Sequence, residues 1–568
     1  MYQITSNCVC CHNCAMECPV GAIGFVGMKY EINTDKCVEC GRCVQVCHTC
    51  SAIETTEIEP VSHKRIIKDC DVVVCGGGSG IVAAVRAAQQ GKRVILLEKS
   101  KKLGGNTDYA HGFFTIFTKW HEAAGMPNVQ EEAINVFWER SGNRMDKDIL
   151  RSVVFGIDSF FDWLAEFPET EKAFKLVPKG GLMGDGPIYS PGMISIPNRV
   201  HENLLCRDQA IGPGWSGTFV KYLMLKVIAE QKLWVEILTE HRAEHLLTNA
   251  SGAVTGVRAS DPGGEVQINA SSVILATGGM GRSDEKLQKY FDFFDCETPI
   301  HRFSVPTDTG DAIDMLQELG VEPDPDRLFC SLFGPAHHPF SYTLNRIFGH
   351  DTSIWVNLDG KRWRNEAGGL MSDMTSIARQ PREIAWGIFD QQGIDYIIEE
   401  YMNNPEFTDE HWVYECYQED LDNEAALTNG PVKRADTLAE LAEKIGVDPV
   451  VFCETINRYN AFGVSGKDED FDKPVQFLLP LSKKGPYYAI YGQRFSEGAF
   501  GGLRVNSSCE VTREDGQVIP GLYGVGDATS AMHFRGHLAV ISELTWAMAS
   551  SFMSGANAAE YVDSLEVK

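Results

Sequence analysis

The first 47 residues contain two copies of one cysteine spacing, and this repeat constrains the fold more than any other feature of the chain. The spacing C-x2-C-x2-C-x3-C occurs first at Cys8, Cys11, Cys14 and Cys18, with Pro19 directly after it. It occurs again at Cys37, Cys40, Cys43 and Cys47, with His48 in the place of the proline. Three closely spaced thiolates can grip one metal cluster from a tight loop, while the displaced fourth reaches a second cluster.

The spacing resembles that of bacterial ferredoxins with two [4Fe–4S] clusters. We expect one cluster to take Cys8, Cys11, Cys14 and Cys47, and the other to take Cys37, Cys40, Cys43 and Cys18. Structural zinc also uses C-x2-C pairs, but rarely as two full runs of four. Disulfides need an oxidising compartment, and the first seven residues do not resemble a signal peptide. We therefore expect a cytoplasmic protein with eight cluster ligands.

Composition limits the remaining possibilities. A length of 568 residues exceeds a single core and predicts three or four domains. No run of 18 apolar residues occurs, so no membrane span is expected. The net charge of −27 argues against nucleic acid or an anionic membrane as a partner.

After residue 70 the sequence predicts a dinucleotide-binding unit. Val72 to Val74 form a short apolar strand, residues 81–90 an alanine-rich helix, and residues 94–97 a second strand that ends at Glu98. The turn between the first strand and the helix reads Gly76, Gly77, Gly78, Ser79 and Gly80. Glycines let the backbone approach a pyrophosphate, and the acid accepts a hydrogen bond from a ribose hydroxyl.

The glycine spacing departs from the G-x-G-x-x-G pattern in one of two ways. Either Cys75 replaces the first glycine, or the turn is one residue short after Gly78. Four later segments are also rich in glycine or turn residues. They are Gly104-Gly105-Asn106-Thr107, Ala276-Thr277-Gly278-Gly279, Thr309-Gly310-Asp311 and Gly526-Asp527.

The order of these segments resembles the fumarate reductase/succinate dehydrogenase flavoprotein superfamily, in particular the soluble branch with fumarate reductases, urocanate reductases and ketosteroid dehydrogenases. The resemblance covers about Asp71 to Ala559 and includes Asn357 to Glu366, which resembles the cap signature N-x-x-G-x-R-(F/W)-x-N-E. It implies an α+β ferredoxin-like 2[4Fe–4S] domain (1–62), a linker (63–69), a split α/β Rossmann-type FAD-binding domain (70–321 and 491–568) and an inserted α+β capping domain (322–490).

The resemblance also implies the residues that bind FAD. The glycine turn (Gly76, Gly77, Gly78, Ser79, Gly80) would hold the ADP half, together with Glu98 and Lys99. Gly104 to Thr107 would contact the pyrophosphate or the flavin. Ala276 to Gly279 and Thr309 to Asp311 would line the cofactor, and Gly526-Asp527 would lie near the ribityl chain.

The cationic positions depart from the fumarate reductase pattern. The proton-donor arginine aligns with about Leu370, the histidine pair with Glu497 and Gly498, and the carboxylate-binding arginine with His537. Only His338-Pro339 matches the family's His-Pro element. A dicarboxylate needs several fixed cations to replace its hydration. We therefore expect a larger or less anionic unsaturated substrate than fumarate.

These patterns predict an FAD-dependent oxidoreductase acting on CH–CH or C=C bonds, most simply an ene-reductase. A ferredoxin, flavodoxin or reductase subunit would reduce the clusters, and hydride would pass to a small activated alkene. The candidate catalytic residues are Arg535, His537, His533, Tyr488 and His338. A dehydrogenase running in reverse, or an electron-transfer subunit of a larger complex, is the alternative.

Overall fold

The computed structural model describes residues 66–566 apart from 111, 141–142, 144, 174, 178–192, 196–215, 293–300, 336–341, 368–373, 404–416, 428–429, 531–532, 535–536 and 539–542. Of the first 65 residues it describes 2–4, 13–16, 18, 20–26, 29–34, 36–37, 43–44, 47 and 53–55. The chain forms two compact units. Unit 1 comprises Met1–Glu57, Phe294–Pro306 and Cys330–Glu497, and unit 2 comprises Ile58–Phe293, Thr307–Phe329 and Gly498–Lys568.

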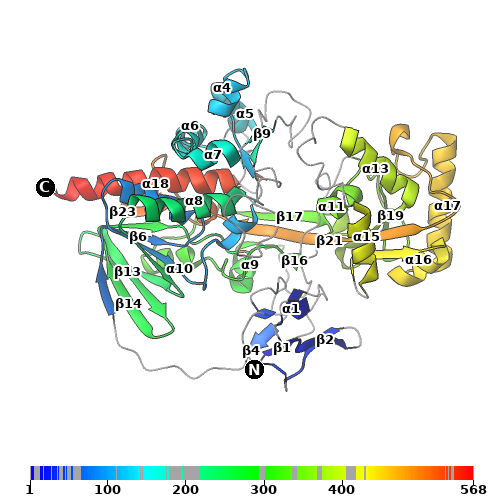
Figure 1. Cartoon of the computed structure of the whole chain (residues 1–568), viewed down its shortest axis with the longest axis horizontal. Helices are drawn as coiled ribbons and strands as arrows, with labels where there is room; N and C mark the ends of the chain where they lie inside the picture. The colour runs from blue at the N-terminus through cyan, green and yellow to red at the C-terminus, as the bar shows by residue number, and fades with distance from the viewer. Residues whose placement is uncertain are drawn as a thin grey trace. The chain divides into compact units, whose positions relative to one another are not determined.

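Unit 2 is built on a six-stranded sheet in the order β11-β7-β6-β15-β23-β22 (Figure 1). Its strands are β6 (Val72–Cys75), β7 (Val94–Glu98), β11 (Val235–Thr239), β15 (Ser272–Leu275), β22 (Glu510–Thr512) and β23 (Val518–Gly524). The first five strands in this order are parallel, and only β22 is antiparallel to its neighbour. Strands buried on both faces explain why β6 and β7 read as continuous apolar runs.

The alternation of side chains along these strands creates two separate cores. Val72, Val74 and Leu96 face one core, which contains helices α3 (Gly80–Gln89), α6 (Lys147–Leu164) and α18 (Glu543–Glu566). Val73 and Ile95 face the other core, beneath a four-stranded sheet. That sheet has the order β12-β13-β14-β5, with bounds Arg242–Thr248, Val254–Asp261, Gly264–Asn269 and Ile66–Asp69.

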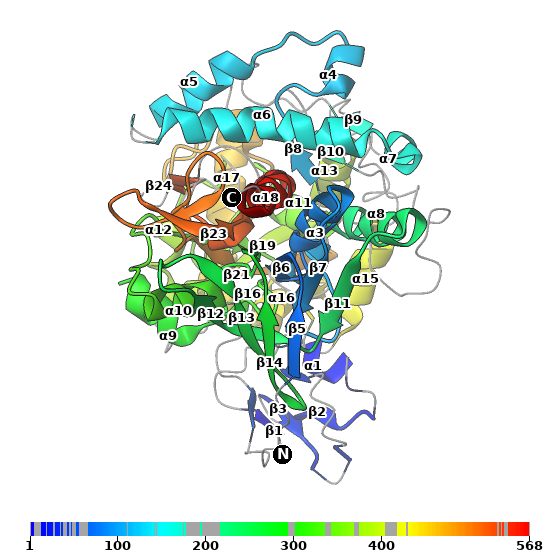
Figure 2. The ribbon, with the colours of Figure 1, turned by 90° about the vertical axis from the view of Figure 1, so that its left-hand side faces the viewer.

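Helix α18 lies along α3 and α6 and covers the large sheet (Figure 2). Small residues permit the close approach of α18 to α3, since an added Cβ at Gly555 would lie 2.5 Å from the carbonyl oxygen of Ala83. Helix α6 begins at Asp146, whose carboxylate accepts hydrogen bonds from the N–H groups of Asp148 and Ile149. The helical layer thus fixes the face from which the glycine turn emerges.

Unit 1 contains a second six-stranded sheet with a core on each face. Its strands are β16 (His301–Arg302), β17 (Leu328–Gly334, which begins in unit 2), β18 (Ile354–Asn357), β19 (Ile384–Asp390), β20 (Val432–Ala435) and β21 (Tyr487–Phe500, which ends in unit 2). One core contains α11 (Tyr342–Phe348), α13 (Gln391–Asn403) and α15 (Tyr417–Ala426). The other contains α16 (Leu438–Ile445) and α17 (Pro449–Ser465).

The N-terminal segment has short strands around a small core of its own. Strand β1 (Tyr2–Ile4) pairs antiparallel with β4 (Ile53–Thr55), and β2 (Ile23–Val26) pairs antiparallel with β3 (Lys29–Ile32). A helical turn, α1 (Asn13–Met16), precedes β2. Ile4, Ile23 and Tyr30 are buried together with Cys14 and Cys43.

The predicted elements around the glycine turn are confirmed to within one residue: β6 matches Val72 to Val74, α3 matches residues 81–90, and β7 matches residues 94–97. The domain boundaries proposed from the resemblance stay a prediction. In the described part of the chain, no helix has the length and apolar character needed to cross a membrane.

Candidate functional site

The glycine turn leaves the carboxyl end of β6 with no room for side chains. Gly76 has a φ of +116°, and a Cβ there would lie 2.0 Å from the carbonyl oxygen of Ala276. A Cβ at Gly77 would overlap Leu103 and approach the Glu98 carboxylate. The backbone of the turn is therefore bare and lies at the N-terminus of α3, where amide dipoles favour negative charge.

The structure favours one of the two glycine alignments. Gly80 is the first residue of α3, and a Cβ there would lie 2.9 Å from both Ala276 Cβ and Val74 Cγ1. This is the role of the third glycine, which brings the helix against the strand. Cys75 then stands in the first glycine position. It is the last residue of β6 and is 1% exposed, and burial raises the pKa of its thiol to about 12.

Glu98 lies at the end of β7 and faces the turn. Its Oε2 accepts a hydrogen bond from the Gly77 N–H at 2.9 Å, and its Oε1 accepts one from the Ser100 N–H at 2.7 Å. The side chain is 6% exposed, so these bonds hold the carboxylate in one orientation. A carboxylate has further acceptor sites, so it can still receive a ribose hydroxyl.

The segment Gly104 to Thr107 lies beside the glycine turn. The Gly104 N–H donates to the carbonyl oxygen of Gly77 at 3.0 Å, and the 3₁₀-helix η1 (Gly105–Tyr109) follows. A buried ion pair, which sequence reasoning missed, anchors this helix. Lys221 Nζ, on α8 (Ser216–Gln231), donates to Asp108 Oδ1 at 2.6 Å. Because the partners are 113 residues apart, no local pattern could have identified them.

The segments at 276–279 and 526–527 reach the same end of the sheet. The Ala276 N–H donates to Cys75 O at 2.8 Å, and the Val525 N–H donates to Leu275 O at 3.1 Å. Asp527 Oδ1 and Thr277 Oγ1 are buried and have no hydrogen-bond partner in the described structure. Burial raises the pKa of Asp527 well above its ordinary value, and the nearby carboxylates of Asp308 and Glu543 add to this effect. Such groups suit a hydroxyl-rich ligand, which would supply the missing partners.

Thr309 and Asp311 meet Lys99 in a network of charges at the start of α10 (Asp311–Glu318). Lys99 Nζ donates to Thr309 Oγ1 at 2.8 Å and to Asp311 Oδ2 at 2.7 Å. Arg242, a partner that the sequence did not indicate, donates to Asp311 Oδ1 at 2.9 Å. Burial alone would raise the pKa of Asp311, but Lys99 and Arg242 outweigh it and hold the pKa below its usual range. Here the predicted cofactor residues bind one another.

The candidate catalytic residues are less well placed. Tyr488 is 1% exposed in a core of unit 1, where its hydroxyl donates to Gln391 at 2.8 Å, and these contacts give no support to a catalytic role. His533 and His537 lie on β24 (His533–Phe534) and β25 (His537–Leu538), which pair antiparallel. Arg535 and His338 lie outside the described residues. The catalytic assignments therefore stay predictions.

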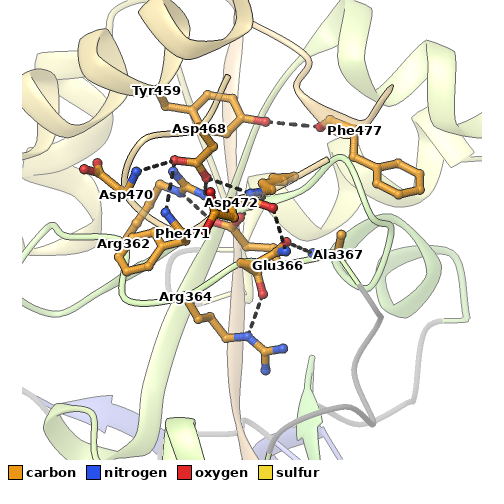
Figure 3. Close-up of polar contacts among 12 residues, drawn as sticks. Arg362, Arg364, Glu366, Ala367, Tyr459, Asp468, Asp470, Phe471, Asp472 and Phe477 are labelled. Carbon is orange, nitrogen blue, oxygen red and sulfur yellow. Dashed lines mark hydrogen bonds and ion pairs between the residues drawn. The ribbon is translucent and has the colours of Figure 1, made fainter. Parts of the chain in front are cut away.

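The cap signature forms a buried cluster of charges in unit 1 (Figure 3). Arg362 donates to Glu366 at 2.7 and 2.8 Å and to Asp468 at 2.9 Å. Its guanidinium lies between the rings of Tyr459 and Phe471. Lys473 completes the cluster 3.4 Å from Glu366, and the four charges sum to zero. Every partner is a protein group, which points to a role in folding the cap.

Five of the eight predicted cluster ligands lie within the described structure, and Cys8, Cys11 and Cys40 do not. Cys14 and Cys43 are 7% and 8% exposed and share the small N-terminal core. Cys18 Sγ accepts a hydrogen bond from the Ala22 N–H at 3.2 Å. Among the described residues no group of three or more histidine, cysteine or acidic side chains is arranged to hold a metal. A set of thiols still fits iron–sulfur chemistry by its donor type.

The fold and the glycine cradle of unit 2 are those of a dinucleotide-binding protein. The model of the FAD binding domain family matches residues 71–541, and the chain belongs to this family. It is 27% identical to the vinyl phenol reductase of Lactiplantibacillus plantarum over 81% of this chain and 90% of that protein. It is 25% identical to the urocanate reductase of Eggerthella lenta over 88% of this chain and 76% of that protein.

The fold is shared with a solved flavocytochrome c3 fumarate reductase in an open conformation. The TM-score is 0.67 with 22% sequence identity, over 87% of this chain and 79% of that chain. The predicted superfamily is thereby confirmed, as is the predicted enzyme class, an FAD-dependent oxidoreductase acting on CH–CH or C=C bonds. The iron–sulfur part of the prediction is not tested by these similarities, which concern the flavoprotein.

Proposed function

We propose that this chain is an ene-reductase. Electrons would enter from a low-potential donor, pass through two [4Fe–4S] clusters to FAD, and reach an activated C=C bond of a small organic substrate other than fumarate. The observation that carries the proposal is the convergence of Gly76 to Gly80, Ala276 to Gly279 and Asp527 at one end of a parallel sheet. When bound, FAD would supply hydride transfer and the clusters single-electron transfer.

The chain's own residues have distinct tasks in this proposal. The bare backbone of the glycine turn would hold the pyrophosphate, and Glu98 would accept from the ribose. Asp527, which carries a raised pKa, would stay protonated near neutrality and could donate to a ribityl oxygen. Lys221 would keep η1 in place through its ion pair with Asp108.

The cysteine repeat supports an electron entry through clusters. Cys14 and Cys43 are separated by 29 residues, as are the two copies of the motif, and both are buried in one small core. The repeat thus places equivalent residues of the two copies in similar surroundings. The hydrogen bond to Cys18 Sγ is one of the contacts by which a protein tunes a cluster's potential.

The proposed substrate class rests on two arguments. The relatives named above act, by their names, on vinyl phenol and urocanate, which are unsaturated compounds. The positions of Leu370, Glu497 and His537 carry no permanent positive charge, although the fumarate reductases are expected to have cationic residues there. Both arguments favour an activated alkene with at most one carboxylate.

An anaerobic experiment tests the proposal. Protein purified without oxygen should contain one FAD and about eight iron atoms per chain. After reduction with dithionite, the flavin absorbance should return on addition of vinyl phenol, urocanate, acrylate or cinnamate, and only slowly on addition of fumarate. If no alkene reoxidises the flavin, or if fumarate is the fastest, the proposal is wrong. Faster turnover of the saturated compounds with an artificial acceptor would favour the reverse reaction.

A further inference from the structure

Arg327 and Tyr290 form a pair of unsatisfied polar groups in unit 2. Tyr290 ends α9 (Asp284–Tyr290), and Arg327 precedes β17. The Arg327 guanidinium carbon lies 4.5 Å from the centre of the Tyr290 ring. Arg327 Nε and the Tyr290 hydroxyl are both buried, and neither has a hydrogen-bond partner in the described structure. Two buried donors beside each other require an explanation.

The charge of Arg327 is also unpaired within the described part of the chain. Its Nη1 donates to the backbone carbonyl of Asp324 at 2.6 Å, whereas the Asp324 carboxylate accepts from Arg504 at 3.1 Å. A second cation, Lys289, lies 5.1 Å from the centre of the Tyr290 ring. Arg362, Arg458 and Arg494 each bind a carboxylate, so the environment of Arg327 differs from theirs.

The pair lies next to the predicted flavin site. The Gly501 N–H donates to the carbonyl oxygen of Asp527 at 2.8 Å. On its other side, a Cβ built on Gly501 would lie 3.3 Å from Arg327 Cα. Gly501 has a φ of +97° and no side chain to separate the two segments. One residue therefore separates the backbone of Arg327 from that of Asp527.

We propose that Arg327 and Tyr290 bind the oxygen of a substrate carboxylate or carbonyl that activates the C=C bond, which rests on the proposed function. The guanidinium would donate through Nε and an Nη group, and the phenol would donate its O–H. Donors fixed at this oxygen would stabilise the negative charge that develops when hydride adds to the β-carbon and a proton then adds to the α-carbon. Arg327 would thus supply one cation in place of those expected from the fumarate reductases.

Burial of the guanidinium is consistent with an anionic ligand. Desolvation lowers the pKa of Arg327 from its ordinary value, because a charge without a partner is disfavoured in a low-dielectric site. A bound carboxylate would compensate this cost. A flavin oxygen offers the same acceptor chemistry, so an experiment must distinguish the cofactor from the substrate.

Binding of cinnamate and of neutral cinnamamide, measured on the oxidised holoenzyme by the change in the flavin spectrum, tests the proposal without turnover. In Arg327→Met the dissociation constant for cinnamate should rise roughly 10- to 100-fold, since hydrogen bonds to charged groups are lost. That for cinnamamide should rise much less. Arg327→Lys should retain part of the affinity, and Tyr290→Phe should weaken binding roughly three- to tenfold. Arg458→Met, at an exposed arginine, serves as the control.

Three outcomes would overturn the proposal. Cinnamate could bind to Arg327→Met and to Arg327→Lys as tightly as to the control. It could fail to perturb the flavin of the unmodified enzyme at all. The Arg327 and Tyr290 variants could lose FAD while the control retains it, which would assign the acceptor oxygen to the cofactor. If the unmodified enzyme binds cinnamate through Arg327 but reduces no alkene, the proposed function fails and the binding site stands.

Discussion

At the scale of single residues, Glu98 gives the most direct test of the cofactor site. Glu98→Gln keeps the shape of the side chain but removes the charge that receives the Gly77 N–H. We expect FAD to bind roughly 10- to 100-fold more weakly, as charge-assisted hydrogen bonds are worth about 1.5–3 kcal/mol. Flavin content after dialysis measures the loss. Glu265→Gln, at a half-exposed site, should retain FAD; equal retention in both variants would remove Glu98 from the site.

Asp527 makes the stability of the FAD-free protein depend on pH. Its raised pKa means that the folded state keeps a proton that the unfolded state has already lost above its ordinary value of 3.8. Stability at this residue is therefore complete at low pH and falls as pH rises toward the folded pKa. In Asp527→Asn that loss is absent. The Tm of the variant minus that of the unmodified protein should increase from about pH 5 to about pH 8; parallel curves would contradict the assignment.

Single residues also show where sequence reasoning succeeded and failed. Val72 to Val74, the glycines after them and Glu98 lie within one local unit, so their pattern could be read directly from the sequence. Tyr488 was proposed from its nearness in sequence to the C-terminal segment, but β21 places it in a core. Arg327 and Tyr290 come together only in the folded chain, and no spacing in the sequence links them.

At the scale of elements, the contact between β6 and α3 depends on Gly80. In Gly80→Ala the new methyl group would meet Ala276 and Val74 at 2.9 Å, and neither neighbour is a flexible side chain. We expect a loss of about 1–3 kcal/mol, as for other overpacked sites, together with reduced FAD content. Denaturant unfolding and flavin absorbance measure the two effects.

Gly156→Ala, within α6, is the matched control for this prediction. Its methyl group would meet Met553 Sδ at 2.6 Å, but methionine can change rotamer. Alanine also has a higher helix propensity than glycine by about 1 kcal/mol. We expect little change in stability and full FAD content. If both alanine variants behave alike, the strand–helix contact is not what requires glycine at position 80.

The buried charge cluster of the cap provides a prediction at the scale of the whole molecule, because the two units have separate cores. Glu366→Gln would leave Arg362 and Lys473 without the charge of their shared partner. Breaking a buried pair in this way costs about 3–5 kcal/mol. Calorimetry should show earlier unfolding of part of the molecule, with FAD content unchanged. Asp470→Asn, in an exposed pair, should cost well under about 1 kcal/mol.

The overall architecture was predictable where the chain repeats known local units and less so where distant segments combine. The glycine turn and the apolar strands after it led to the FAD-binding fold, which the family match confirms. The four-stranded sheet β12-β13-β14-β5 brings residues 66–69 beside residues 264–269, and no turn signal links these segments. The contents of the cap depend on ion pairs that span more than 100 residues, such as Arg362 with Asp468.

Strands β17 and β21 are paired in the sheet of unit 1, and the boundaries of the long insertion fall within them, at Cys330 and Glu497. The insertion therefore departs and returns at neighbouring strands, which in sheets are about 4.8 Å apart. A gene in which a few glycine and serine codons replace this insertion would encode a compact flavoprotein with continuous strands of unit 2 on both sides. In such a scaffold, exchange of the insertion between relatives becomes a route to new substrate ranges.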